Sequence, residues 1–356
     1  MFPRFCLGLV ASLVLLLTAC KDPGAITAGS ALYTFDCTSN QVFIWTDLDT
    51  LYDHPANPPT YQLSASLFSQ VTNLAWGGVC FDINRGILYL VSDTGSIVRV
   101  SSIRTQTGTV PSAQVVSFSL SNTGRLTPST FGQASLDAAN DTLYITENGG
   151  SSTQIWVVTN ASAQAQSASL ALQSLQVSGD SGGTGVAAAS GVVYAFLQDG
   201  GPVGLDAWTG PRLRQGTSGA FPADGSKVII GNNTGLGIYG ALALDTGDGY
   251  LFAARHNVDS GGAAQPIQVF TTGQFNSGIN ATPYKTLGSA TDQSSLRVIS
   301  HPGNKDWLVG LLGEGTVGYS TILLWKTPLG GTAAVSVTGA PAGSVLKGLA
   351  VDGNAS

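Results

Sequence analysis

One strand pattern recurs about every 54 residues along this chain, and its last copy is divided between the two ends of the sequence. Each copy contains a short apolar strand that often ends in Asp, a turn, a second strand built around Leu-Tyr or its equivalent, and a third apolar strand after a polar loop. The divided copy begins at residues 346–352 and continues at residues 31–35. A repeat divided in this way predicts a closed ring, because its two parts must meet to complete one unit.

The ring is expected to be a β-propeller. The clearest copy has strands at 78–82, 87–91 and 96–100, and weaker apolar segments between copies, such as 114–118, are expected to form an outermost fourth strand. Six such copies predict an all-β, six-bladed β-propeller with four-stranded antiparallel blades, closed by N- and C-terminal strands that share one blade. Seven blades is the alternative if residues 227–230 belong to a further unit. A composition with 46 Gly and only 10% charged residues is typical of an all-β chain with many tight turns.

Four tryptophans fall at the end of the third strand in four different copies: Trp45, Trp156, Trp208 and Trp325. Exposed aromatic rings could bind carbohydrate. Recurrence at one structural position, however, favours packing between neighbouring blades.

The repeated hydrophobic-Asp, Leu-Tyr and apolar-strand signature resembles that of the NHL-repeat, gluconolactonase-like and related six-bladed propellers. The resemblance covers nearly the whole chain after residue 30. It implies the fold but no particular activity, because the signature maintains the blade.

Residues 1–19 are expected to be a signal peptide. Arg4 precedes an apolar run at 7–17, and the segment ends in Leu-Thr-Ala-Cys at Cys20. This ending resembles the lipobox of bacterial lipoproteins, in which the Cys is acylated after cleavage; an ordinary cleaved signal peptide is the alternative. We therefore predict a lipidated Cys20 and tether over 20–30 and a single propeller domain over 31–356. The resemblance implies an extracytoplasmic lipoprotein of the cell envelope, at the outer membrane if the cell is Gram-negative.

The charge balance excludes nucleic acid as a partner. The chain has 15 basic and 21 acidic side chains, and removal of Arg4 with the signal peptide leaves 14 basic side chains and a net charge of −7. An acidic surface is repelled by phosphate backbones and by anionic lipid headgroups. Attachment to a membrane is therefore expected to come from the acyl chains.

The mature chain keeps two cysteines, Cys37 and Cys80. Because export leads to an oxidising compartment, a disulfide between them is one expectation, and two buried free thiols are the other. The repeat places Cys37 at the end of one second strand and Cys80 at the start of the next first strand, which favours the disulfide.

The candidate site lies among loops that enter the first strands and loops that join second to third strands, since both kinds emerge on one face of a propeller. The candidates on this face are Asp93, Glu147, Asn148, Asp199, Arg255, His256, Asn257, Asp292 and Glu314. Gluconolactonase-like enzymes hold calcium on this face with Glu, Asn and Asp from separate blades, so the resemblance implies a calcium site to which Glu147 and Asn148 with Asp199 or Asp93 would contribute. Solvated turn residues are the alternative.

We expect a membrane-anchored binding or interaction module, monomeric, whose partner is an envelope protein, a polymer or a small ligand. A calcium-dependent lactonase-like hydrolase with its site at the channel mouth is the alternative. Convergence of several oxygen ligands on one point would favour the enzyme, whereas dispersed turn residues would favour the binding module.

Overall fold

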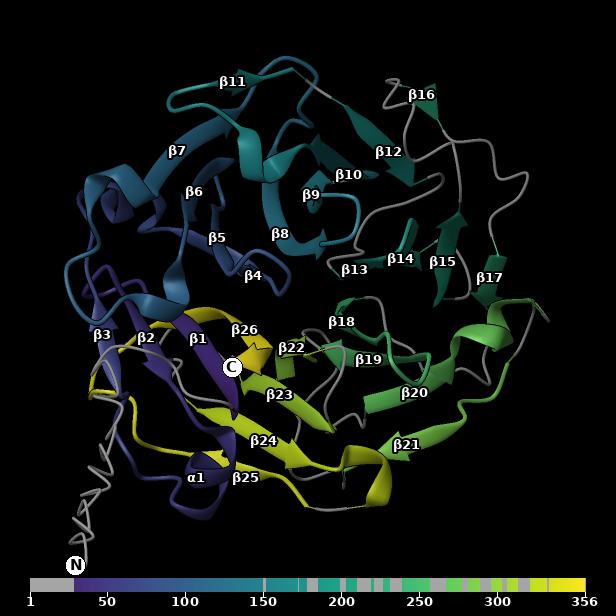
Figure 1. Ribbon diagram of the computed structural model, residues 1–356. Helices are drawn as coiled ribbons and strands as arrows, with labels where there is room; N and C mark the ends of the chain where they lie inside the picture. Colours follow the sequence, from purple (N-terminus) through teal and green to yellow (C-terminus); the bar gives the residue numbers. More distant parts are fainter. Residues whose placement is uncertain are drawn as a thin grey trace, which may run out of the picture.

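The structure is a computed structural model of the 356-residue chain. It describes residues 29–149, 152–171, 173–177, 185–198, 203–209, 219–220, 227–230, 239–256, 267–276, 281–288, 296–302, 306–312, 321–331 and 333–355. Within these ranges the strands form six sheets arranged around a common centre (Figure 1). Each sheet is called a blade and takes the name of its innermost strand.

The β26 blade joins the two ends of the chain. From the centre outwards it contains β26 (Leu346–Ala355), β1 (Gly29–Asp36), β2 (Gln41–Trp45) and β3 (Tyr61–Leu63). β1 lies antiparallel to β26, with Leu32 opposite Val351 and Thr34 opposite Leu349. The predicted propeller fold, and its closure by strands from both ends of the chain, are confirmed.

Two blades have five strands where the sequence predicts four. The first contains β4 (Leu74–Asp82), β5 (Ile87–Ser92), β6 (Ser96–Val100), β7 (Val115–Leu120) and β11 (Ser169–Leu170). The second contains β8 (Ser129–Asp137), β9 (Thr142–Gly149), β10 (Ser152–Thr159), β12 (Ser174–Val177) and β16 (Gly219–Ala220). β11 and β16 each come from the following blade and pair in parallel with an outermost strand. They cover edges that would otherwise present unpaired backbone groups.

The three remaining blades have four strands each in the described residues. They are β13 (Val186–Ala189), β14 (Val192–Gln198), β15 (Val203–Thr209) and β17 (Lys227–Ile230); β18 (Tyr239–Asp245), β19 (Tyr250–His256), β20 (Ile267–Thr271) and β21 (Lys285–Leu287); and β22 (Leu296–Ser300), β23 (Trp307–Leu312), β24 (Ile322–Lys326) and β25 (Val335–Val337). Residues 227–230, which would have belonged to an additional unit, are β17, the outermost strand of the β13 blade.

Helices are few and short in the part of the chain that the structure describes. They are α1 (Leu48–Asp53) and the 3-10 turns η1 (Ser66–Val71), η2 (Ile103–Thr105), η3 (Ser112–Gln114), η4 (Ala161–Ala163), η7 (Thr272–Asn276) and η8 (Pro328–Gly330). Among the described residues, no helix has the length and apolar character needed to cross a membrane.

The Asp that ends the first strand of a repeat shapes the following turn. The Oδ1 atom of Asp82 accepts hydrogen bonds from the backbone N–H groups of Asn84 and Arg85, at 2.9 and 3.0 Å. The Oδ1 atoms of Asp137 and Asp245 likewise accept hydrogen bonds from the backbone N–H groups of the residues two and three positions later. A short acidic side chain that binds backbone N–H groups in this way favours a tight turn. The repeated Asp therefore serves the fold.

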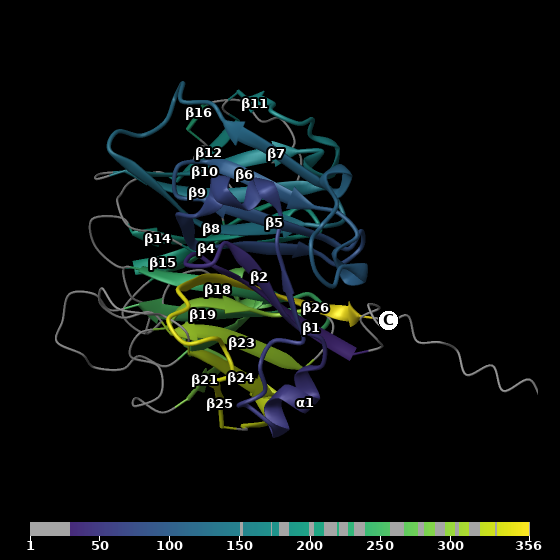
Figure 2. The ribbon, with the colours of Figure 1, turned by 90° about the vertical axis from the view of Figure 1, so that its left-hand side faces the viewer.

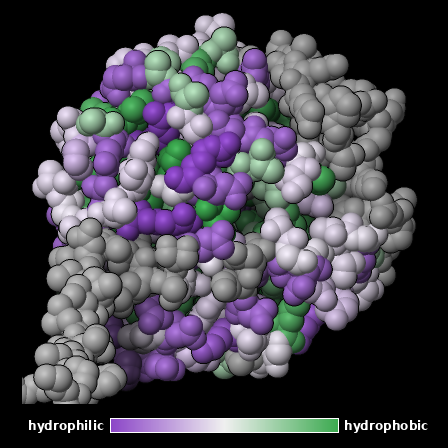
Figure 3. All heavy atoms as spheres, in the orientation of Figure 1, coloured by the Kyte–Doolittle hydropathy of each residue, from purple (hydrophilic) through white to green (hydrophobic). Residues whose placement is uncertain are grey.

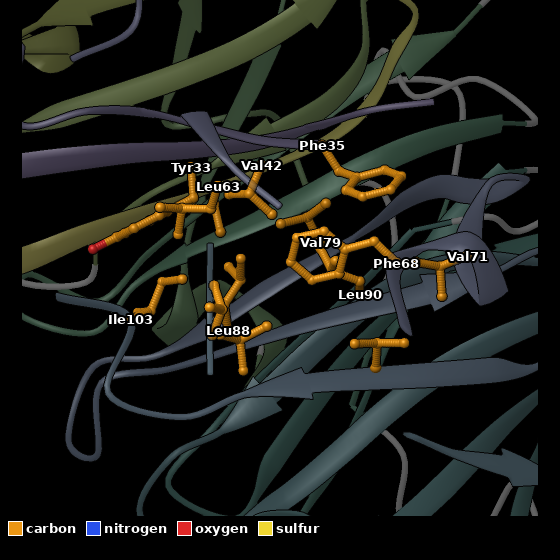
Figure 4. Close-up of a cluster of buried hydrophobic side chains, with 14 of the residues drawn as sticks. Tyr33, Phe35, Val42, Leu63, Phe68, Val71, Val79, Leu88, Leu90 and Ile103 are labelled. Carbon is orange, nitrogen blue, oxygen red and sulfur yellow. The ribbon is translucent and has the colours of Figure 1, made fainter. Parts of the chain in front are cut away.

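The core lies between the blades. Figure 4 shows one cluster, in which Tyr33, Phe35 and Val42 of the β26 blade face Val79, Leu88 and Leu90 of the β4 blade. The Phe35 and Phe68 rings meet edge to face, with their centroids 5.8 Å apart. Trp45, Trp156 and Trp325 are each at most 2% exposed, which confirms the predicted packing role for these three. The side chain of Trp208 lies outside the described residues.

The ring has two distinct faces. The hairpin face carries the turns that join the first and second strands of the blades, at residues 83–86, 138–141, 190–191 and 246–249. The far face carries the turns between second and third strands, such as 93–95, and the loops that enter first strands, such as 121–128. Gly29 and Ala355 are paired where β1 begins and β26 ends, so both ends of the described chain lie on the hairpin face (Figure 2).

Candidate functional site

Gln133 spans the centre of the ring. It lies in β8, is 7% exposed, and its side chain binds the backbones of two other inner strands. Its Oε1 atom accepts hydrogen bonds from the N–H groups of Val186, at 3.2 Å, and Leu242, at 3.0 Å, and its Nε2 group donates to the carbonyl of Leu242 at 2.7 Å. One amide thus ties together the inner strands β8, β13 and β18.

Further along β8, two more side chains bind β13. Ser135 Oγ accepts a hydrogen bond from the Ala188 N–H, and Asp137 accepts from the N–H groups of Ser190 and Gly191. The bonds from Gln133, Ser135 and Asp137 to Val186, Ala188 and Ser190 each join residues 53 positions apart, which is close to the period of the repeat. Inner strands have one edge without a strand partner, and these side chains satisfy its N–H groups.

A cavity of about 280 Å³ lies between Gln133 and the hairpin face. Small and apolar residues from all six inner strands dominate its wall, among them Val79, Ala187, Leu242, Val298 and Leu349. Polar residues that line it include Asn84, Ser135, Ser190, Thr246 and His301. The volume approaches the lower end of small-molecule pockets.

His301 is uncharged at neutral pH. Its ring is stacked on Phe252, with the centroids 5.3 Å apart, and its Nε2 atom lies 3.9 Å from Asp245 Oδ2. Burial lowers the pKa of His301 to about 4, against the opposing influence of Asp306 and Asp248. Burial also raises the pKa of Asp245. A histidine with so low a pKa is a weak base at neutral pH, so it contributes little to acid–base chemistry there.

The described part of the predicted calcium site lies on the far face, on the opposite side of the ring from the cavity mouth. Asp93 follows β5, and its carbonyl accepts a hydrogen bond from the N–H of Phe131, which lies opposite Glu147 in the β8–β9 pair. Asn148 comes next in β9, and its Oδ1 atom accepts from Thr153 Oγ at 3.1 Å. The structure therefore brings Asp93, Glu147 and Asn148 to one region.

Glu147 is fully buried and uses both oxygens in hydrogen bonds. Oε1 accepts from Ser129 Oγ, at 2.6 Å, and Arg125 Nε, at 3.2 Å. Oε2 accepts from Gln154 Nε2, at 2.5 Å, and Trp156 Nε1, at 2.7 Å. Glu147 thus stabilises the β8 blade, which the sequence did not reveal because its partners lie 7 to 22 residues away.

Arg125 places a positive charge inside the predicted calcium site. Besides Glu147, its guanidinium binds the carbonyl of Thr94, the residue after Asp93, at 3.0 Å, and lies 4.6 Å from the centre of the Phe131 ring. A fixed cation between the expected ligands opposes the binding of a second cation. Within the described ranges, no group of three or more His, Cys, Asp or Glu side chains is placed to hold a metal ion.

The remaining predicted site residues lie partly or wholly outside the described residues. Arg255 and His256 end β19, but their side chains lie outside the described residues. Four further candidates lie wholly outside the described residues: Asp199, Asn257, Asp292 and Glu314. The predicted lipidation site, Cys20, also lies outside them.

Cys37 and Cys80 are free thiols. A backbone hydrogen bond with Leu74 places Cys37 at the beginning of β4, whereas Cys80 is the seventh residue of the same strand. Leu74 lies opposite Ser92 and Cys80 opposite Tyr89, so the irregular part of β4 between them covers three residues of β5, about 10 Å, which is beyond the reach of a disulfide. The expected disulfide is therefore not formed in this structure, because β4 begins earlier than the repeat indicated.

Gln133 is not among the residues predicted for the site, although its position in the repeat is unusual. Four residues before the Asp that ends the first strand, other copies have Gly78, Ala241 and Gly348, whereas this copy has Gln133. A long amide at a position occupied elsewhere by Gly or Ala indicates a contact across the ring, not packing between blades.

No family model matches the sequence, and no curated protein matches it. Among solved structures, a chain of "Crystal structure of Nidogen/Laminin Complex" is similar with a TM-score of 0.55 and 11% identity, over 91% of this chain and 98% of that chain. A chain of "Kuenenia stuttgartiensis Hydrazine Synthase" has a TM-score of 0.44 and 12% identity, over 75% of this chain and 68% of that chain. The first of these likenesses shows that the chain has a β-propeller fold.

Proposed function

We propose that this protein is a lipid-anchored, extracytoplasmic binding module: a six-bladed ring that captures a partner or ligand and performs no chemistry on it. The cavity closed by Gln133 carries the proposal. It is concave, lies on the axis of the ring, and has a wall of mostly apolar and uncharged polar groups, in which the one carboxylate among the described lining residues, Asp137, is bound to backbone N–H groups of the turns. Its histidine is neutral and stacked on Phe252, so the cavity offers shape and hydrogen bonds more than catalytic groups.

The ligand that such a cavity supports is a small uncharged molecule, or an uncharged side chain that protrudes from a protein partner. The similar propeller chain belongs to a complex of nidogen and laminin. A protein partner in the envelope is therefore the first partner class to test. Attachment through Cys20 rests on the Leu-Thr-Ala-Cys segment.

A calcium-dependent hydrolase is the less favoured function. Glu147, its most characteristic candidate ligand, makes four hydrogen bonds, and Arg125 provides the charge that calcium would supply. The oxygen atoms near Glu147 therefore support the blade and leave little capacity for a divalent ion.

Two measurements test the binding role against the enzyme, one on a soluble form, residues 21–356, and one on the full chain. The first is metal content with thermal melting in calcium and in chelator, followed by assays on lactones and esters. The second is photo-crosslinking in the native envelope from exposed turn positions on each face, Asn84 and Asn122. A binding module gives a metal-free protein, no turnover, and a discrete crosslinked species from one position. Stoichiometric calcium with chelator-sensitive lactone hydrolysis would replace this proposal with the enzyme.

A further inference from the structure

We infer that the hairpin face, with the mouth of the central cavity, is held toward the lipid bilayer, and that the far face points away from it. This inference rests on the proposed lipid anchor at Cys20. It adds the orientation of the ring on the membrane, which the anchor alone does not specify. The orientation in turn determines which molecules can reach each face.

The first observation is where the tether joins the ring. β1 begins at Gly29, on the hairpin face, and is the second strand from the axis in its blade. Figure 2 shows β1 and the C-terminus on the same side of the ring. The chain that leads back to Cys20 therefore starts from this face and from near the centre of the ring.

The second observation is the length of the tether. Nine residue steps separate Cys20 from Gly29. Fully extended, they reach about 30 Å, and a flexible chain of this length has a typical end-to-end distance of about 16 Å. The bilayer surface therefore lies within about 30 Å of the point where β1 begins.

The thickness of the ring decides between the two faces. β4 and β8 have nine residues each, but both have a register shift against the next strand: they lie opposite β5, of six residues, and β9, of eight residues. The ring is therefore about 20–26 Å thick from one face to the other. To bring the far face against the bilayer, the tether would have to cross two further strands to the rim, about 10 Å, and then run down this thickness. That path reaches or exceeds the extended length of the tether and is about twice its typical end-to-end distance, so the tether favours the hairpin face toward the membrane.

The chemistry of the hairpin face agrees with a tethered surface. Its turns carry charges of both signs, with Arg85 exposed and Asp248 exposed, and Asp141 half-buried. Figure 3, which views this face, shows hydrophilic residues interspersed with apolar ones over the part of the face that is coloured. Such a surface neither inserts into lipid nor binds headgroups strongly, so the acyl chains and the short tether hold it in place.

In this orientation the two faces are accessible to different molecules. A ligand reaches the central cavity only through the gap between the ring and the bilayer, which favours molecules that are supplied at the membrane surface. A partner that is not in the same membrane meets the far face, where the Arg125–Glu147 pair supports the blade.

Fluorescence quenching in vesicles tests the orientation. Single labelling sites are placed on the hairpin face, by Asn84→Cys or Ala139→Cys, and on the far face, by Asn122→Cys or Thr123→Cys, because all four residues are exposed. The background is a Cys37→Ser, Cys80→Ala form that keeps the parental melting temperature. The lipidated protein is reconstituted into vesicles that contain headgroup-quencher lipids, and the same labels on a Cys20→Ala form are the matched control.

We expect several-fold stronger quenching of the two hairpin-face labels than of the two far-face labels, and none on the Cys20→Ala form. Equal quenching of both faces on vesicle-bound protein, as a ring lying on its edge would give, or stronger quenching of the far face, overturns the orientation but leaves the anchor intact. Failure of the Cys20 protein to bind vesicles overturns the anchor, and the orientation with it.

Discussion

Arg104 and Asp352 join the last strand of the chain to the neighbouring blade. The guanidinium Nε and Nη2 groups of Arg104, in η2, donate to the two carboxylate oxygens of Asp352, in β26, at 2.6 and 2.8 Å. Arg104 Nη2 also donates to the carbonyl of Ile83, at 2.9 Å. The Asp352 side chain is fully buried, and its hydrogen bond with Arg104 raises the pKa of Arg104. The pair thus holds the strand that closes the ring.

Replacement of Asp352 by Asn should weaken the closed ring. The variant loses a buried charge-assisted pair, so we expect the free energy of unfolding to fall by about 2 kcal/mol. The matched control is Asp49→Asn, whose pair with Lys326 is exposed on both sides and should contribute little. Urea unfolding measures both variants, and equal effects at the two sites would contradict the role of Arg104–Asp352.

A chain that ends after Val345 lacks β26 and should not form a stable ring. It loses the buried side chains Leu346, Leu349 and Val351 and leaves β1 without its inner partner. Three such side chains correspond to about 6 kcal/mol, which is comparable to the whole stability of many domains. Thermal melting followed by circular dichroism should show no cooperative transition, whereas a chain that ends after Asn354 should melt like the full-length protein.

Replacement of Gln133 by Ala should destabilise the protein by about 1–2 kcal/mol, because the backbone groups of Val186 and Leu242 lose their partner and only water can replace it. Gln133→Glu should cost more at neutral pH, since a carboxylate oxygen would face the Leu242 carbonyl. Gln62→Ala, on an exposed residue of β3, is the control and should change the unfolding midpoint little. A Gln133→Ala protein as stable as the control would show that the bridge is dispensable.

We expect the protein to lose stability in mild acid because His301 is buried in its neutral form. Its pKa is about 4 in the folded protein and 6.5 in the unfolded chain, so between these values the unfolded state binds more protons. The contribution of neutral His301 to the free energy of unfolding is complete above pH 6.5. It is lost as the pH falls toward 4, and the total loss is about 3 kcal/mol. Unfolding at pH 7 and pH 5 should show a smaller difference in His301→Asn than in the parent protein. Identical pH dependence in the two proteins would contradict the low pKa.

Glu147→Gln should destabilise the protein to the same extent with and without calcium. An amide in place of the carboxylate presents N–H groups to donors such as Trp156 and Arg125, so we expect a loss of about 2–3 kcal/mol. Thermal melting of the variant and the parent protein, in calcium and in chelator, measures this loss of stability. A difference between variant and parent that appears only in calcium would show that Glu147 is a metal ligand after all.

Part of the candidate site could be predicted from the sequence. Asp93, which follows β5, and Glu147 and Asn148, at the end of β9, do lie on one face, because the alternation of antiparallel strands sends the ends of all second strands to the same side. The sequence could not show that Arg125 enters this site, because Arg125 belongs to a loop outside the repeated pattern. It also could not show that the cavity opens on the opposite face, since that depends on Gln133.

The closed ring could be predicted from the repeat alone. The period, the Asp that forms each first turn and the copy divided between 346–352 and 31–35 are local patterns, and each acts through neighbours in the same blade. Contacts between distant polar groups are visible only in the folded chain: Gln133 binds Leu242, 109 residues away, and Arg104 binds Asp352, 248 residues away. Hydrogen bonds of this kind depend on the spacing and rotation of whole blades, which are set by packing between them and not by any local pattern.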